Sequence, residues 1–281
     1  MNIKEIRKIA IENLIKSNIE DSNTKISILL QYLLSMSKTE IMLHENMELD
    51  ETQKEEIFKC VEEIIAGKPI QYITHHQEFM GLDFYVDENV LIPQPDTEIL
   101  VEEALHMINR KNENIRILDL CTGSGAIAVS IENYALDRNI IKIYASDISA
   151  EALEIARKNA ILNNEETNIR FIKSNMFENI NDKFDIIVSN PPYIETQTIA
   201  NLSKEVQNEP HIALDGGADG LDFYRIIAKE AKKYLNRNGW ILFEIGYNQK
   251  EAVSNLLQEE KYENITCIKD LNGNDRVIMA M

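Results

Sequence analysis

Apolar residues recur at helical spacing through the first 75 residues of the chain. Ile6 and Ile9 mark one such face, and a later segment from Thr52 to Ala66 ends at Gly67-Lys68-Pro69. Apolar side chains three or four residues apart share one face of a helix, and glycine followed by proline stops a helix. The pattern predicts that residues 1–75 form a small helical bundle. Because it shows no cluster of catalytic groups, we interpret it as a domain for recognition.

Between residues 76 and 94 the pattern changes to short extended runs. Phe79–Val86 and Val90–Ile92 are rich in apolar, β-branched and aromatic residues, and Asp87-Glu88-Asn89 between them is a turn signal. We therefore expect a β-hairpin that links two domains, followed by a boundary at Pro93.

From residue 95 to residue 281, apolar runs alternate with amphipathic segments. Asp96 or Thr97 is the expected N-cap of a first helix that ends near Ile108. Alternating strands and helices predict an α/β fold, a Rossmann-like sheet that is mostly parallel and covered by helices on both faces. The last two strands are expected to form a hairpin across Leu271–Asn274. The seven expected strands are Ile115–Leu120, Ile141–Ser146, Ile169–Lys173, Phe184–Ser189, Trp240–Ile245, Ile265–Lys269 and Arg276–Met281, with further helices near 125–137, 149–163, 221–236 and 248–259.

The motif Asn190-Pro191-Pro192-Tyr193 directly follows the expected strand Phe184–Ser189. Ligands of open α/β sheets sit beyond the carboxyl ends of such strands. The prolines stiffen the turn and lack N–H groups, so the Asn190 side-chain oxygen and a nearby carbonyl are available as acceptors. Two acceptors can hold both hydrogens of an –NH2 group, and Tyr193 offers a flat face for a planar amide or base. The alternative is a stiff loop that merely ends a strand.

A glycine-rich turn, Cys121–Gly125, follows the first expected strand of the sheet. Glycines let the backbone approach a ligand closely, and the helix start beyond them presents free N–H groups. NAD, flavin and S-adenosylmethionine sites all use relatives of this turn, and a simple strand-to-helix turn is the alternative. Asp147, at the end of the second strand, can accept hydrogen bonds from ribose hydroxyls or cap the next helix. Asp119, ahead of the turn, can meet an ammonium group or order the loop.

After the third strand, Asn175 can face the amino group of an adenine and Met176 can cover its ring, unless both serve only the fold. The candidate cofactor-binding residues are Asp119, Cys121, Thr122, Gly123, Ser124, Gly125, Asp147, Asn175, Met176 and Asn190.

The chain is strongly acidic, with a net charge of −18 and a pI of about 4.7. This charge argues against broad nucleic-acid binding, which depends on Lys and Arg, and favours a basic protein partner. The three cysteines lack the spacing of metal ligands and are expected to be reduced thiols in a cytoplasmic protein. No apolar run is long enough to span a membrane, and we expect neither a metal nor a membrane partner. We expect a monomer.

A larger set of motifs, in order from about residue 60 to the C-terminus, extends this picture. They are Gly67–Ile73, Glu78-Phe79, Leu91–Glu98, Asp119–Ala126, Asn190–Ile194, Glu209-Pro210, Ala213–Leu221 and Glu244–Gly246. Together they resemble the HemK/PrmC family of class I S-adenosylmethionine-dependent methyltransferases. The resemblance implies S-adenosyl-L-methionine as cofactor and, as substrate, the side-chain amide of glutamine in the Gly-Gly-Gln motif of class I peptide chain release factors. It also implies that Asn190, Pro191, Pro192 and Tyr193 are catalytic.

The chain departs from the family pattern at four positions. Gln94 stands where the family usually has Arg, Cys121 where it often has Gly, and Asn175-Met176 where an acidic residue and Trp are frequent. The change at Gln94 removes a positive charge near the face expected to meet the partner.

Three other functions compete with this interpretation. An adenine-N6 nucleic-acid methyltransferase would use the same Asn-Pro-Pro-Tyr motif on an exocyclic amine, and the acidic charge weighs against it. A non-catalytic, methyltransferase-like binding protein is disfavoured because the acidic residue, glycine turn and tetrapeptide are intact. An NAD-dependent oxidoreductase would need an acid/base pair for hydride transfer, which the sequence does not suggest.

Overall fold

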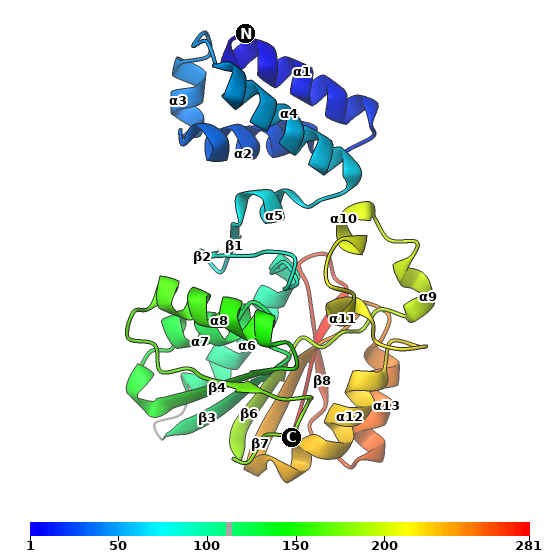
Figure 1. Cartoon of the computed structure of the whole chain (residues 1–281). Helices are drawn as coiled ribbons and strands as arrows, with labels where there is room; N and C mark the ends of the chain where they lie inside the picture. The colour runs from blue at the N-terminus through cyan, green and yellow to red at the C-terminus, as the bar shows by residue number, and fades with distance from the viewer. Residues whose placement is uncertain (111–113) are drawn as a thin grey trace. The chain divides into compact units, whose positions relative to one another are not determined.

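The computed structural model describes residues 1–110 and 114–281, and the chain divides into two compact units (Figure 1). The first unit comprises Met1–His75 together with Ser203–Asn208, and the second comprises His76–Leu202 and Glu209–Met281. Residues 203–208 therefore pack with the N-terminal helices, although they lie inside the expected domain 95–281.

The first unit is a bundle of helices around one apolar core. Ile6, Leu14, Leu29 and Ile64 are fully buried in it. Capping boxes, such as the pair Asn2 and Glu5, satisfy free N–H groups at the helix starts. The helices are α1 (Ile3–Lys16), α2 (Ser22–Leu34), α3 (Lys38–Leu43), α4 (Glu51–Ala66), α5 (Ile70–Thr74) and α10 (Lys204–Gln207).

Helix α10 is held in the first unit by two polar contacts. Lys25 forms an ion pair with Glu205, and the Asn208 side chain donates to the carbonyl oxygen of Gly67 at 3.1 Å. A Cβ at Gly67 would lie 2.7 Å from the Cβ of Lys204. The glycine that ends α4 is thus also required for the close approach of α10.

The β-hairpin is present, but its turn lies seven residues before the expected one. It pairs β1 (Gln77–Phe79) with β2 (Leu82–Phe84) across Met80-Gly81, whose φ angles are 54° and 70°. Two positive φ angles are typical of the tight turn that matches the twist of a hairpin, and Gly81 was the signal for it. The expected strand Val90–Ile92 is wrong, and Asp87 instead caps a local turn by accepting from the Asn89 N–H.

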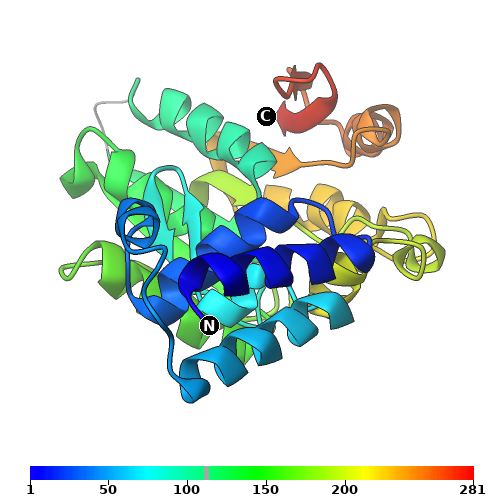
Figure 2. The same cartoon turned by 90° about the horizontal axis from the view of Figure 1, so that it is seen from above.

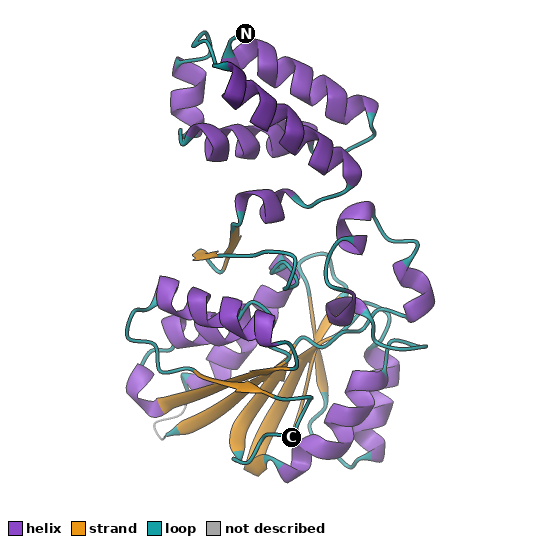
Figure 3. Cartoon of the chain, in the orientation of Figure 1, coloured by secondary structure: helices purple, strands orange, loops and turns teal. Residues whose placement is uncertain are grey.

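The second unit contains a seven-stranded sheet in the order β5-β4-β3-β6-β7-β9-β8 (Figure 3). Five strands are parallel, while β9 runs antiparallel to both of its neighbours, so the predicted terminal hairpin is confirmed. The fold is therefore the predicted Rossmann-like α/β sheet. The strands are β3 (Ile115–Leu120), β4 (Ile141–Asp147), β5 (Arg170–Lys173), β6 (Phe184–Ser189), β7 (Leu235–Glu244), β8 (Thr266–Lys269) and β9 (Asp275–Ala280).

Helices cover both faces of this sheet (Figures 1 and 2). One buried cluster joins α6 (Pro95–Ile108), α7 (Ala126–Tyr134) and α8 (Ala150–Asn163) to one face. A second cluster joins α12 (Asp222–Glu230) and α13 (Lys250–Glu259) to the other face. The connection between β6 and β7 also contains α9 (Thr196–Ile199), α11 (His211–Leu214) and the 3-10 turn η2 (Ala231–Lys233). A further 3-10 turn, η1 (Arg138–Ile140), precedes β4.

The start of α6 differs from the expectation. Its N-cap is Gln94 and Pro95 occupies the first helical position, so neither Asp96 nor Thr97 caps the helix. Proline suits that position because its missing N–H would have no partner there in any case. Thr97 is thereby placed within the first turn of the helix, and its hydroxyl makes another contact instead of a cap.

Candidate active site

The carboxyl ends of β3, β4 and β6 meet at one edge of the sheet. In the parallel register, Leu120 lies opposite both Ser146 and Ser189. The glycine turn follows β3, Asp147 is the last residue of β4, and Asn190 follows β6. The register therefore brings them together although the sequence separates them. They surround a cavity within the second unit.

Most of the expected site residues line this cavity. Those that do are Cys121, Thr122, Gly123, Ser124, Asp147, Asn175, Met176, Asn190 and Pro192. Over the described part of the chain, Asp119, Gly125, Pro191 and Tyr193 do not line it. Asp119 binds the lining residue Thr122, while Gly125, Pro191 and Tyr193 are each next to a lining residue in the sequence.

The Asn190 side chain is anchored through its nitrogen atom. Its Nδ2 donates to the hydroxyl of Thr97 at 3.1 Å, and Thr97 in turn donates to Glu244 Oε2 at 2.5 Å. With its nitrogen so engaged, Asn190 presents Oδ1 as an acceptor at the cavity that it lines. Thr97 also lines the cavity. Its contact with Asn190 could not be predicted from the sequence, because 93 residues separate the two.

Tyr193 turns its hydroxyl to the same buried carboxylate. The phenol donates to Glu244 Oε1 at 3.1 Å. Burial raises the pKa of Tyr193 well above its ordinary value, and the charge of Glu244 raises it further. The phenol is therefore a neutral donor throughout the physiological range, and its hydroxyl is directed to Glu244.

The glycine turn has the backbone geometry of a ligand-binding loop. Cys121, Gly123 and Gly125 have φ angles of 62°, 53° and 82°, in the left-handed region. A Cβ at Gly125 would lie 3.0 Å from the Cβ of Ala156, so this glycine permits close packing of α8. A Cβ at Gly123 would meet nothing within 4 Å, so this glycine borders open space. Cys121 adopts a conformation that favours glycine, the residue common there in the resembling family.

Asp147 fixes the loop from the neighbouring strand. Its two carboxylate oxygens accept from the N–H groups of Gly123, at 2.9 Å, and Ser149, at 3.0 Å. Burial raises its pKa, and the hydrogen bonds from Ser149 and Gly123 oppose that rise. Each oxygen keeps acceptor capacity, and Asp147 lines the cavity, so a diol can be bound there.

Asp119 lies beneath the loop. Its Oδ2 accepts from the Thr122 hydroxyl at 2.5 Å and from the N–H of Ala128 at 3.2 Å, and its side chain is fully buried. Its Oδ1 is buried without a hydrogen-bond partner. Of the two roles considered for Asp119, this geometry favours ordering of the loop.

Met176 and Asn175 behave differently from each other. Met176 is 8% exposed and lines the cavity, with its sulfur 3.9 Å from that of Cys121. Asn175 is exposed, and its Nδ2 donates to Glu178 at 2.9 Å, which leaves its oxygen as the free group. The cavity thus combines a carboxylate at Asp147 with an apolar wall at Met176 and Ile127, which fits the ribose and the base of an adenosyl group.

The long connection between β6 and β7 packs against the Asn190–Tyr193 motif. A Cβ at Gly216 would lie 2.7 Å from the Cα of Tyr193, so the two backbones touch. Gln249 Nε2 donates to the carbonyl oxygens of Tyr193, at 2.9 Å, and Gly220, at 3.2 Å. Glu209 accepts from the N–H of Ile92 at 2.9 Å. Neither Gln249 nor the partner of Glu209 was evident from the sequence, because both contacts join distant segments.

The chain is similar to known proteins along its whole length. A family model described as the PrmC N-terminal domain matches residues 5–74, and one described as Methyltransferase small domain matches residues 95–218. A release factor glutamine methyltransferase of Clostridium acetobutylicum is 40% identical over 285 residues, which cover 100% of this chain and 99% of the relative. The chain belongs to the release factor glutamine methyltransferase family.

Another relative in the family, from Clostridium botulinum, is 41% identical over 269 residues and 94% of each chain. The solved structure of a methyltransferase from Pyrococcus furiosus matches the fold with a TM-score of 0.53 and 20% identity, over 79% of this chain and 97% of that one. The family resemblance inferred from the motifs is confirmed. The protein is an S-adenosylmethionine-dependent methyltransferase.

Two features are absent from the described residues. Within residues 1–110 and 114–281, no helix is long and apolar enough to cross a membrane. The same residues contain no group of three or more His, Cys, Asp or Glu side chains placed to hold a metal ion.

Proposed function

We propose that this protein transfers a methyl group from S-adenosyl-L-methionine to the side-chain amide nitrogen of the glutamine in the Gly-Gly-Gln motif of class I peptide chain release factors. The observation that supports this most directly is the Asn190 side chain. Its Nδ2 is bound to Thr97 and its Oδ1 is left as an acceptor at the cavity. The full-length similarity to relatives named release factor glutamine methyltransferase agrees with that acceptor.

The chemistry requires that a weak nucleophile be aimed. A carboxamide nitrogen reacts poorly because its lone pair is delocalised into the carbonyl group. Asn190 Oδ1 and the carbonyl of Pro191 accept the two N–H hydrogens and direct the nitrogen at its target. Such alignment can lower the activation free energy by about 7–11 kcal/mol. A strong base is not needed, because a methylated, cationic amide loses its proton readily.

When bound, the cofactor supplies an electrophilic methyl group on a sulfonium. Asp147 accepts from the ribose hydroxyls, Met176 covers the adenine, and the backbone of Gly123 admits the ligand at close range. Asn175 offers its free oxygen to the adenine amino group. Asp119 holds the loop through Thr122 and Ala128.

The partner we propose is a release factor that presents basic groups. The chain's charge of −18 favours such a partner and disfavours nucleic acid. Residues 1–75 serve its recognition, and we expect the enzyme to act as a monomer in the cytoplasm.

The experiment uses labelled S-adenosylmethionine with four separate acceptors: a release factor, the same factor with Gly-Gly-Ala in place of Gly-Gly-Gln, DNA and RNA. Label on the Gly-Gly-Gln factor alone supports the proposal. Label on adenine in DNA or RNA would replace it with the nucleic-acid methyltransferase. Binding of the cofactor without transfer to any acceptor would favour a non-catalytic protein.

A further inference from the structure

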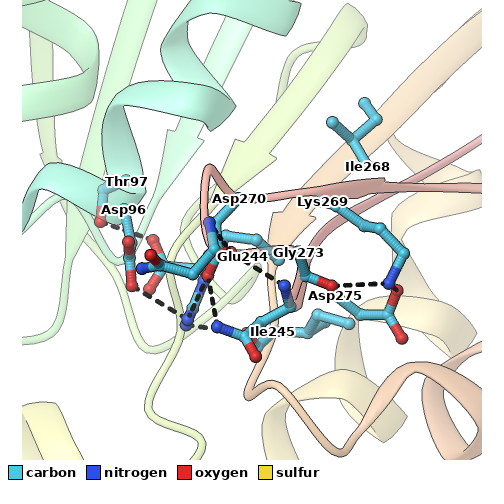
Figure 4. Close-up of polar contacts among 12 residues, drawn as sticks. Asp96, Thr97, Glu244, Ile245, Ile268, Lys269, Asp270, Gly273 and Asp275 are labelled. Atoms are coloured by element: carbon cyan, nitrogen blue, oxygen red, sulfur yellow. Dashed lines mark hydrogen bonds and ion pairs between the residues drawn. The ribbon is translucent and has the colours of Figure 1, made fainter.

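A buried glutamate stands directly behind the proposed acceptor of the substrate amide. Glu244 is the last residue of β7 and is 2% exposed. Its Oε2 accepts from the Thr97 hydroxyl at 2.5 Å (Figure 4). Its Oε1 accepts from the Tyr193 hydroxyl at 3.1 Å. Burying a carboxylate is costly unless it is paired and hydrogen-bonded, so a glutamate here calls for a reason.

The hydrogen bonds form a directed chain from Glu244 to Asn190. An ionised carboxylate can only accept, so the single hydroxyl proton of Thr97 points to Glu244. The Thr97 oxygen then has only lone pairs left to offer. Asn190 must therefore turn its NH2 toward Thr97, at 3.1 Å, and its Oδ1 toward the cavity. An asparagine amide has two ends of similar shape, and this chain selects one orientation.

Charged groups surround the Glu244 carboxylate and affect its pKa. Arg276 forms ion pairs with Asp96, at 2.9 Å, and Asp270, at 3.2 Å. Both aspartates lie near Glu244 (Figure 4). Burial raises the pKa of Glu244, while the hydrogen bonds from Thr97 and Tyr193 and the charge of Arg276 oppose the rise. The negative charge of Asp96, like burial, raises the pKa of Glu244.

We propose that Glu244 is a positioning residue for methyl transfer, acting through Thr97 to fix which end of the Asn190 amide faces the substrate. The wrong end would present an NH2 group to the NH2 group of the substrate glutamine, and no hydrogen bond could form. The second arm, to Tyr193, holds the same motif from its other end. This inference rests on the proposed function, since it concerns the acceptor of that substrate.

The test is a double-mutant cycle on the single-turnover rate of methyl transfer to the Gly-Gly-Gln release factor. Glu244→Met removes both acceptor oxygens at nearly constant volume. We expect it to lower the rate by about 10²-fold, the effect of a misplaced reacting group, with the cofactor Kd changed by less than about threefold. In an Asn190→Ala background, Glu244→Met should change the rate by less than about threefold, because there is no amide left to orient.

Three further variants make the result decisive. Glu132→Met removes another buried glutamate, 5% exposed, which binds Asn164 and Asn168 outside the site, and should leave the rate unchanged. Thr97→Val should repeat the effect of Glu244→Met, while Thr97→Ser, which keeps the hydroxyl, should restore the rate. Thermal unfolding shows whether Glu244→Met folds. If it does not, Thr97→Val replaces it in the double-mutant cycle with Asn190→Ala, and Thr97→Ser serves as the control.

The two hypotheses fail in different ways. If the wild-type protein labels the release factor but the effects of Glu244→Met and Asn190→Ala multiply, then Glu244 does not act through Asn190 and the inference is wrong. If the wild-type protein binds the cofactor but does not label the release factor, the proposed function is wrong and the inference falls with it.

Discussion

The side chain of Asn159 binds both backbone polar groups of Tyr85, 74 residues away in the sequence. Its Oδ1 accepts from the Tyr85 N–H at 2.7 Å, and its Nδ2 donates to the Tyr85 carbonyl oxygen at 2.9 Å. The same Nδ2 donates to the Ser124 carbonyl oxygen at 2.9 Å. Asn159 is fully buried, so one amide connects the segment after the hairpin to the glycine turn.

Asn159→Asp should therefore destabilise the protein and weaken cofactor binding. Aspartate can still accept from Tyr85 but cannot donate, so the carbonyl oxygens of Tyr85 and Ser124 lose this donor and face a charge. We expect the free energy of unfolding to fall by at least about 2 kcal/mol. Urea unfolding and calorimetric titration with S-adenosylmethionine measure the two effects. Asn272→Asp adds the same charge at an exposed position and should do neither; equal effects of both variants would refute the role of Asn159.

Asn190→Ala should reduce turnover far more than cofactor affinity. The variant removes Oδ1, which we expect to interact with the substrate amide, while the contacts of Asp147 and the glycine turn remain. The expected loss in kcat is about 10²-fold, typical of removing one preorganised hydrogen-bonding group. Filter-binding with labelled cofactor should show a Kd changed by less than about threefold. Asn133→Ala, which removes a half-buried amide that binds Val129 and Arg138 outside the cavity lining, is the control. Near-wild-type turnover of Asn190→Ala would remove this residue from the mechanism.

Gly123→Ala and Gly125→Ala should differ in their cost. Both glycines have positive φ, which costs an alanine about 1–2 kcal/mol. At Gly125 the new methyl group would also press on the Cβ and Cα of Ala156, at 3.0 and 3.1 Å, whereas at Gly123 it meets open space. Thermal unfolding should thus rank Gly125→Ala as the less stable variant, while Gly123→Ala should lose mainly cofactor affinity. The reverse ranking would show that the packing of α8 against the turn is not the constraint.

Asp119 should make stability depend on pH. Burial raises its pKa from 3.8 to about 7. The folded state therefore binds a proton that the unfolded state releases between these values, and stability falls as pH rises toward 7 and levels off above it. Relative to Asp119→Asn, the unfolding free energy of the wild type should decrease by about 2 kcal/mol from pH 5.5 to 7. Urea titrations at several pH values test this, and a difference that does not vary with pH would mean that Asp119 stays ionised.

Local patterns predicted most of the elements but misplaced some of their ends. Acidic and amide residues favour turns, so the sequence predicts the hairpin turn at Asp87–Asn89, yet Met80-Gly81 forms it. Gly81 lay inside an apolar run, and the length of that run suggested one strand where two short ones exist. Similarly, Thr97 was expected as an N-cap because of its residue type, whereas Pro95 begins the helix and frees Thr97 for the site.

The sequence by itself determined the alternation of strands and helices, the glycine turn after β3 and the stiff turn after β6. These depend on hydrophobic spacing and on the backbone restrictions of glycine and proline, which act over a few residues. Only the tertiary structure decided that Thr97 lies between Asn190 and Glu244, partners 93 and 147 residues away. Such contacts follow from strand order and register, which bring the carboxyl ends of distant strands to one edge of the sheet.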